Sequence, residues 1–191
     1  MSSEVGIFGG SFNPPHVAHV MAVAYALSRL GLDEVLVLPV WRHPLDKSLA
    51  PFEDRMEMCR RAMSPLGALV RVLDLERRRV GPSYTIDLLQ ELKRERPDWS
   101  LTLIVGADAY AERHLWRRFA EIERLARVLV MARAGAPPPP ASVSSSPPLP
   151  RVSSSEIRDH LAAGGEPREL LPARVADYIR ARGLYLTPCA P

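Results

Sequence analysis

Two histidines, His16 and His19, stand three residues apart in the stretch PPHVAHV, where a helix is predicted to begin. Side chains at positions i and i+3 of a helix lie on the same side of its first turn. Imidazoles donate hydrogen bonds to phosphate oxygens, and nearby phosphate charge favours their protonated form. The spacing therefore predicts a catalytic pair that binds phosphate. A metal site and a buried structural role are the alternatives.

Two glycines, Gly9 and Gly10, come just before this pair and follow an apolar run at residues 4–8 that reads as a strand. Glycine lets a ligand approach the backbone closely, and a helix N-terminus presents free N–H groups at the positive end of its dipole. A strand, a glycine turn and a helix start together predict an anion site, with Ser11 and Phe12 in the same turn. An ordinary turn is the alternative, and the lysine of G-x-x-x-x-G-K-[ST] is missing.

A second polar cluster, VSSSEIR, spans residues 152–158. Its first serine and its glutamate have the spacing of a capping box, which predicts that a helix begins there. The hydroxyls of Ser154 and Ser155 and the guanidinium of Arg158 are suited to binding a polyphosphate. The alternative is a capped surface helix on which Arg158 is solvated.

The elements that must position these residues follow from the apolar pattern. Short apolar runs predict strands at residues 4–8, 34–40, 68–75, 101–106 and 126–132. Between them lie helical patterns, of which one ends at Gly31, a C-cap residue, and another stops at Pro97. Strands that are apolar on both faces and alternate with helices predict an α/β fold, a doubly wound parallel sheet covered on both sides.

The last third of the chain departs from this alternation. The stretch AGAPPPPASVSSSPPLP at residues 134–150 has no apolar period, which predicts a loop or a semi-rigid spacer. We expect residues 136–148 to be dispensable for folding, because their composition offers nothing to bury. Two helical patterns within residues 151–185 are too short for a domain of their own and are expected to fold back on the sheet.

Length and composition set outer limits on the function. A chain of 191 residues with 47% hydrophobic residues predicts a single globular domain, residues 1–191. The formal charge of +3 suits anionic small substrates and does not argue for nucleic acid. Two cysteines form neither a disulfide framework nor a metal cluster, and Cys59 is expected to be buried. The absence of a signal peptide or a long apolar run favours a cytoplasmic protein, and a homo-oligomer is compatible with the sequence.

At this point a family resemblance becomes visible. The stretch GGSFNPPHVAH resembles the first signature of the nucleotidyltransferase superfamily, although Asn13 stands where Asp is usual and Ala18 where Gly is usual. VSSSEIR resembles the second signature. With PSYTIDLL and the segment beginning VGADAYAERHLW, the chain is similar to bacterial nicotinate-mononucleotide adenylyltransferases over residues 5–185.

This resemblance implies a Rossmann-like nucleotidyltransferase fold and transfer of the adenylyl group of ATP to nicotinate mononucleotide. Mg²⁺ is then expected to be held chiefly by the ATP phosphates. Other superfamily members that use nicotinamide mononucleotide, pantetheine phosphate or a CTP-dependent substrate are alternatives. A non-catalytic nucleotide-binding protein is the alternative from a different class.

The resemblance also implies roles for individual residues. Thr85 is expected to bind the pyridine carboxylate and Trp116 to stack on the ring, whereas Asp108 follows a strand and is suited to a ribose hydroxyl. Helix caps are the alternative for Thr85 and Asp108, and a core anchor is the alternative for Trp116. The usual Pro-Pro-His-Lys stretch is replaced by WRHPLDK, in which Lys47 is assigned to ATP binding and His43 is equally compatible with the surface.

Overall fold

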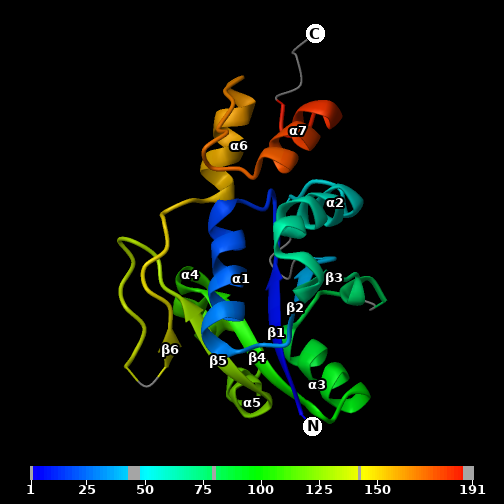
Figure 1. Cartoon of the computed structure of the whole chain (residues 1–191), viewed down its shortest axis with the longest axis vertical. Coiled ribbons are helices and arrows are strands. Elements are labelled where there is room, and N and C mark those ends of the chain that lie inside the picture. Colours follow the sequence, from blue (N-terminus) through cyan, green and yellow to red (C-terminus); the bar gives the residue numbers. More distant parts are fainter. Residues whose placement is uncertain (1, 43–47, 79–80, 142, 187–191) are drawn as a thin grey trace.

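The structure is a computed structural model that describes residues 2–42, 48–78, 81–141 and 143–186. Within these residues, six parallel strands form one sheet in the order β3-β2-β1-β4-β5-β6 (Figure 1). The strands are β1 (Ser3–Gly10), β2 (Glu34–Pro39), β3 (Val70–Val72), β4 (Trp99–Gly106), β5 (Ala126–Met131) and β6 (Ser144–Ser145). The predicted α/β fold with a parallel sheet is confirmed.

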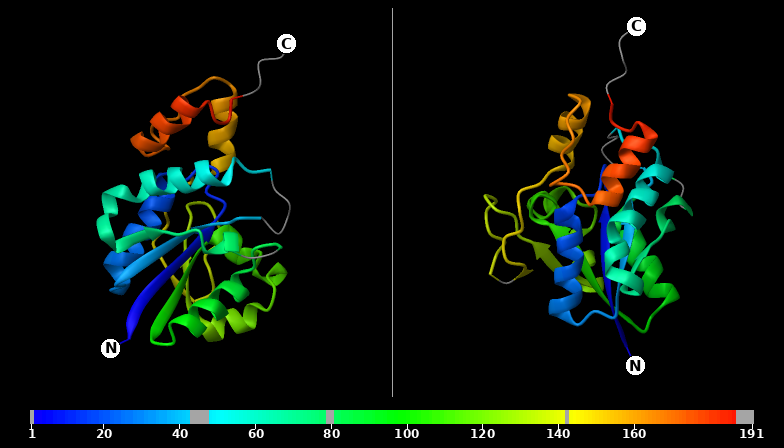
Figure 2. Two further views of the ribbon diagram at one scale, coloured as in Figure 1. Left: turned by 90° about the vertical axis from the view of Figure 1, so that its right-hand side faces the viewer. Right: turned by 45° about the horizontal axis from the view of Figure 1, so that its top comes forward.

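Helices cover both faces of this sheet (Figure 2). The helices α1 (Val17–Leu30) and α2 (Phe52–Met63) lie on one face, and α3 (Thr85–Glu95) and α5 (Phe119–Leu125) lie on the other. Successive strand residues point to opposite faces, so Ile7 packs in the cluster under α3 whereas Phe8 packs in the cluster under α1. Doubly wound packing of this kind explains why the strand sequences are apolar on both faces.

Two of the helices agree closely with the apolar pattern. Helix α1 ends at Gly31, whose φ of 63° and ψ of 35° place it in the left-handed region that glycine adopts without strain. Helix α3 ends before Pro97, and its residues Ile86, Leu89 and Leu92 are buried as their spacing predicts. Both predicted helices are confirmed.

The strand ends differ from the prediction at two places. Strand β1 continues through Gly9 and Gly10, which pair with Leu38 and Pro39 of β2, so these glycines end the strand instead of forming a turn after it. The run predicted at residues 68–75 contributes only the three residues of β3. A 3₁₀ helix, η1 (Ser64–Leu69), precedes β3 and shortens it.

The remaining elements are short or lie outside the sheet. They are η2 (Leu75–Arg78), α4 (Ala107–Ala111), η3 (Arg113–Leu115), α6 (Ser154–Ala162) and α7 (Ala173–Arg182). Cys59 is fully buried in α2, as expected. Among the described residues, every helix is too short or too polar to cross a bilayer.

The C-terminal helices α6 and α7 lie beyond the carboxyl ends of the strands, where Figure 1 shows them above α1 and α2. They pack on α2 and on the first turn of α1, not on the sheet as predicted. The reason is a third apolar cluster, in which Ile157 and Val175 from these helices meet Met58 of α2. Folding back on a helix buries the same apolar stripe as folding back on the sheet.

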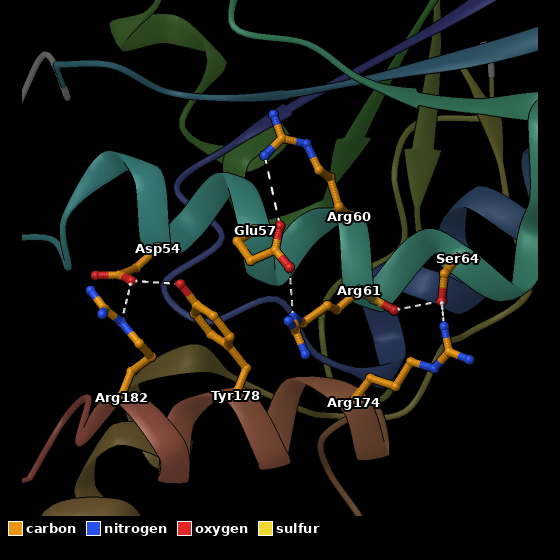
Figure 3. A network of polar contacts seen from close by, with 8 residues as sticks. All are labelled: Asp54, Glu57, Arg60, Arg61, Ser64, Arg174, Tyr178 and Arg182. Carbon is orange, nitrogen blue, oxygen red and sulfur yellow. Dashed lines mark hydrogen bonds and ion pairs between the residues drawn. The ribbon is translucent and has the colours of Figure 1, made fainter.

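Polar contacts reinforce the packing of α7 on α2 (Figure 3). The buried carboxylate of Asp54 accepts hydrogen bonds from Tyr178 Oη at 2.7 Å and from Arg182 Nε at 3.2 Å. The guanidinium of Arg61 lies over the Tyr178 ring, 4.7 Å from its centroid. These contacts attach α7 to α2.

The proline- and serine-rich stretch at 134–150 is only partly the loop that its composition predicts. Its residues Ser144 and Ser145 form β6 and pair with β5. The buried Ser146 accepts a 2.9 Å hydrogen bond from the backbone N–H of Ala132 through its Oγ. The expectation that residues 136–148 bury nothing is therefore wrong, because pairing to a sheet edge satisfies backbone groups without needing an apolar pattern.

Candidate active site

The site lies at the carboxyl ends of β1 and β4. Strand order reverses between these two neighbours, and ligands of doubly wound sheets bind in the crevice at such a switch point. A cavity of about 400 Å³ opens there. Its lining brings together six residues far apart in the sequence, namely Gly9, Gly10, Ser11, Ser83, Thr85 and Trp116. Gly9, Gly10 and Ser11 of the predicted phosphate turn therefore share one cavity with two of the predicted acceptor residues, Thr85 and Trp116, whereas Asp108 is not in its lining.

Gly9 leaves the backbone open at the edge of this cavity. A Cβ atom built on Gly9 would meet no atom of the described residues within 4 Å, so packing does not require glycine there. At Gly10 a Cβ would come within 3.2 Å of the Phe12 ring. Gly9 thus leaves open space beside the cavity, and Gly10 makes room for the Phe12 ring.

Phe12 packs beneath the surface, against the His19 ring. Its side chain is 2% exposed and packs edge-on against His19, with ring centroids 5.0 Å apart. Its φ of 47° lies in the left-handed region, which a non-glycine residue adopts only where its surroundings hold it. The sequence predicts that Phe12 contributes to ATP binding, and its buried side chain leaves only its backbone for that contact.

The two histidines are brought together as their spacing predicts. Their rings stack with centroids 3.7 Å apart and planes 22° from parallel. His16 is the N-cap of α1, and its backbone N–H donates a 3.1 Å hydrogen bond to Nδ1 of His19. Among the described residues there is no group of three or more His, Cys, Asp or Glu side chains that could hold a metal.

Both histidines are neutral in the free protein near pH 7. Burial lowers the pKa of His16 to about 4, and the positive charge of Arg133 acts in the same direction. Burial lowers the pKa of His19 well below its usual value, as do His16 and Arg133. Nδ1 of His16 is buried and has no hydrogen-bond partner among the described residues. The protonated form expected from the sequence therefore requires the negative charge of bound phosphate.

The second motif docks onto the first. Arg158 donates hydrogen bonds to the backbone carbonyl of Asn13 at 2.8 Å and to Ser155 Oγ at 3.1 Å. Ser154 Oγ donates to the backbone carbonyl of Pro14 at 2.9 Å. Helix α6 begins where the capping pattern predicts, because Ser153 Oγ accepts the backbone N–H three residues later. The alternative of a solvated Arg158 on an isolated surface helix is excluded.

Asn13 occupies a buried position that needs an oxygen acceptor. Its Oδ1 accepts hydrogen bonds from the backbone N–H of Ala50 at 3.0 Å and from Tyr185 Oη at 2.9 Å. An aspartate would offer the same acceptor to these donors. The geometry therefore explains why Asn can stand where Asp is usual in the signature.

Arg55 of α2 is a buried cation beneath the turn that the sequence did not single out. It is 2% exposed, and it donates to the backbone carbonyls of Ala50 and Ser11, each at 3.0 Å. Its pKa is lowered chiefly by burial. An arginine in a charged helical stretch is typical of a solvated face, so only the packing of α2 reveals it.

Arg133 is a second residue that sequence analysis did not select. It donates hydrogen bonds to the carboxylate of Asp108, and to the backbone carbonyl of Val152 at 2.9 Å. Because it follows the carboxyl end of β5, its position after a strand was a usable signal. Arg133 thereby joins the predicted ribose-binding residue Asp108 to the start of the second motif.

Thr85 and Trp116 both line the cavity. Thr85 is the first residue of α3, and the N-cap is Tyr84, so Thr85 is not the cap that the alternative proposed. Trp116 is half-buried and packs edge-on against Phe119, with ring centroids 5.8 Å apart. It therefore combines a packing contact with exposure to the cavity. His43 and Lys47 lie outside the described residues.

Comparison with known proteins identifies the family. Residues 7–160 match the family described as cytidylyltransferase-like. Over 185 residues the chain is 46% identical to a protein of Anaeromyxobacter sp., an alignment that covers 95% of this chain and 96% of the relative. Identity is 38% over 185 residues to a protein of Thermus thermophilus, covering 95% and 99%. Each of these relatives is named "probable nicotinate-nucleotide adenylyltransferase".

Solved structures share the fold. The Plasmodium falciparum nicotinic acid mononucleotide adenylyltransferase complexed with NaAD superposes with a TM-score of 0.82 at 22% identity, covering 96% of this chain and 97% of that one. The same enzyme complexed with APC gives a TM-score of 0.77 at 20% identity, covering 96% and 97%. Given the match over residues 7–160 and relatives 38–46% identical along nearly the full length, this chain belongs to the cytidylyltransferase-like family and, within it, to the nicotinate-nucleotide adenylyltransferases.

Proposed function

We propose that this protein transfers the adenylyl group of ATP to nicotinate mononucleotide, releasing pyrophosphate, as a step of NAD biosynthesis. An oxygen of the mononucleotide's 5′-phosphate bonds to the α-phosphorus of ATP. The bond from that phosphorus to the oxygen bridging to the β-phosphate breaks, and pyrophosphate leaves with the electron pair. The product is nicotinate adenine dinucleotide.

The observation that carries this proposal is the shared cavity at the β1–β4 switch point. Its lining includes Gly9 and Ser11 of the phosphate turn as well as Thr85 and Trp116. A single cavity that reaches from a phosphate turn to an aromatic ring and a helix N-terminus suits a mononucleotide whose phosphate must meet a second nucleotide.

Catalysis of this reaction depends on positioning the reactants and stabilising charge in the transition state more than on a covalent enzyme intermediate. His16, His19 and Arg158 supply donors beside the turn where the transferred phosphate would lie. Since phosphate charge raises the pKa of a neighbouring imidazole, substrate binding would protonate the histidine pair as it neutralises the substrate. Ser154 and Ser155, whose hydroxyls contact Pro14 and Arg158, lie in the first turn of α6.

Mg²⁺ enters the proposal as part of the Mg–ATP substrate. Phosphate oxygens and waters are ligands that Mg²⁺ prefers, and it often keeps only one or two protein carboxylates. We further propose ATP and the acceptor mononucleotide as the partners of this chain, and the cytoplasm, where both occur, as its place of action.

The proposal is tested by measuring pyrophosphate release from the purified protein with Mg–ATP and a panel of acceptors. Nicotinate mononucleotide should give a kcat/KM at least ~10-fold above that of nicotinamide mononucleotide, because a neutral amide gains less from a positive helix end than a carboxylate does. Phosphopantetheine should give no pyrophosphate release. CTP in place of ATP separates cytidylyl from adenylyl transfer. The variant Arg158→Ala controls for contaminating activity. Equal kcat/KM for acid and amide acceptors would refute acid selectivity.

A further inference from the structure

The loop that joins β1 to α1 is held by side chains from three distant parts of the chain. Arg55 of α2 donates to the backbone carbonyl of Ser11, and Arg158 of α6 donates to that of Asn13. The third contact comes from beyond α7, where the hydroxyl of Tyr185 donates a 2.9 Å hydrogen bond to Oδ1 of Asn13. The backbone and the side chain of Asn13 are thus held by two different residues from the C-terminal part of the chain.

The chain turns sharply after α7 to bring Tyr185 to this loop. Gly183 is the C-cap of α7 in the left-handed region, and the backbone N–H of Leu184 donates to the carbonyl of Ile179 at 3.1 Å. Tyr185 itself has a φ of 63°, which a non-glycine residue adopts only where its surroundings hold it. Its half-buried side chain packs on the apolar cluster that α2, α6 and α7 share. This packing and the hydrogen bond to Asn13 together hold Tyr185 in place.

Helix α7, from which Tyr185 extends, is fixed on the helix that supplies Arg55. The residue before Arg55 in α2 is Asp54, whose buried carboxylate accepts hydrogen bonds from Tyr178 and Arg182 of α7 (Figure 3). The loop before α1 therefore contacts α2 directly through Arg55, and indirectly through α7 and Tyr185.

The segment before α7 contacts the other end of the same loop. The backbone N–H of Val17, the first residue of α1, donates to the carbonyl of Leu170 at 3.1 Å. His16 is the residue before Val17 and the N-cap of α1. Residues 170–186 thus hold the loop at Asn13 and again directly after His16.

The Tyr185 hydroxyl supplies its hydrogen bond without adding charge. Burial raises the pKa of Tyr185 well above its usual value, whereas the positive charges of Arg158 and Arg55 act in the opposite direction. The phenol is therefore protonated at neutral pH, and its partner is a neutral amide. A negative group at this place would offset the charge of Arg158 and weaken the attraction of the loop for phosphate.

We propose that Tyr185 is a positioning residue, whose hydroxyl holds Asn13 so that the loop before α1 keeps the shape that receives the triphosphate of ATP. This inference rests on the proposed function. Among the described residues that line the cavity, Thr85 and Trp116 are present and Tyr185 is not. Tyr185 therefore acts on the phosphate loop and not on the ring of the acceptor. Small displacements of groups that position a reacting centre are costly in rate.

The test compares Tyr185→Phe with Tyr178→Phe, because each removes one hydroxyl and one hydrogen bond. Pyrophosphate release with Mg–ATP and nicotinate mononucleotide gives kcat and both KM values. Tyr185→Phe should lower kcat about 10-fold and raise KM for ATP, with KM for nicotinate mononucleotide within about 2-fold of the wild type. Tyr178→Phe should keep kcat within about 2-fold yet unfold at least about 3 °C lower, because the buried Asp54 loses a donor.

A double-mutant cycle with Asn13→Ala tests whether Tyr185 acts through Asn13. The double variant should lose no more kcat than Asn13→Ala alone, since the hydroxyl then has no acceptor to hold. Losses that multiply would overturn the inference, as would a wild-type kcat in Tyr185→Phe or equal losses of kcat in the two phenylalanine variants. Absence of pyrophosphate release from the unmodified protein would overturn the proposed function and the inference with it.

Discussion

The guanidinium of Arg158 donates a hydrogen bond of 2.8 Å to the backbone carbonyl of Asn13, 145 positions earlier in the chain. Ser154 from the same helix turn donates to the next carbonyl, that of Pro14. Helix α6 therefore holds the loop that leads from Gly10 to α1, and it brings a cation to the same place. Arg158 thus holds the backbone of this loop and places a positive charge beside it.

Replacing Arg158 with alanine should lower kcat by about 10²–10³, because it removes a charged donor from the transferred phosphate. Arg158→Lys should recover part of this loss, since lysine keeps the charge but cannot bridge Asn13 and Ser155. Pyrophosphate release at saturating substrates gives kcat. Arg180→Lys, on the exposed face of α7, is the control. A wild-type kcat in Arg158→Lys would show that charge alone matters.

Replacing His16 or His19 with alanine should also reduce kcat by about 10²–10³ while the protein stays folded. His19 has a second role, because its Nδ1 accepts the backbone N–H of His16. His19→Asn keeps an acceptor near that atom, so it should match the wild type in circular dichroism and unfolding temperature yet resemble His19→Ala in kcat. Near wild-type turnover in either alanine variant would contradict the catalytic assignment.

The lowered pKa of His16 makes stability depend on pH in a defined direction. The pKa is about 4 in the folded protein and 6.5 ordinarily, so the unfolded chain binds the proton more tightly. Stability is complete above pH ~6.5 and is lost progressively as pH falls toward about 4. This group accounts for about 2 kcal/mol of loss between pH ~7.5 and ~5.

Urea unfolding at these two pH values should therefore show a smaller acid loss for His16→Gln than for the wild type, by about 2 kcal/mol. Glutamine does not titrate, and His19 is retained in both proteins. Parallel losses in the two proteins would mean that His16 is protonated in the folded state.

The proline-rich stretch should divide into a dispensable part and a structural part. Replacing Pro137, Pro138 and Pro140, which are exposed, with glycine or serine should leave the unfolding temperature within about 2 °C. Ser146→Ala removes the acceptor of the Ala132 N–H and should cost about 2 kcal/mol, or about 5 °C. Differential scanning fluorimetry measures both. An unchanged unfolding temperature for Ser146→Ala would mean that the whole stretch acts only as a spacer.

Trp116 should contribute affinity for the acceptor without selectivity. Trp116→Ala should raise KM about 10-fold for nicotinate and nicotinamide mononucleotides alike, because a ring face stacks on either pyridine. Trp116→Phe should restore part of the affinity. Thr85→Ala, by contrast, should narrow the acid-to-amide ratio of kcat/KM. A changed ratio in Trp116→Ala would show that the indole itself discriminates between acid and amide.

The sequence by itself determined the local features of this protein. The start of α1 near His16, the Gly31 C-cap and the Ser153 cap all depend on residues within one turn of each other. Such signals are readable because backbone angles and capping bonds are set by near neighbours. The family resemblance added the expectation that the first motif acts with the second and that Thr85 and Trp116 bind the acceptor.

Only the tertiary structure decided which distant groups meet. The burial of Arg55 under the turn and the pairing of Arg133 with Asp108 could not be read from the sequence. An apolar period reports that a face is buried, but it does not say against what, and polar residues have no period at all. The strand order that sets β1 beside β4 brings residues 9 and 106 to one edge, and that order is fixed by crossover packing over the whole chain.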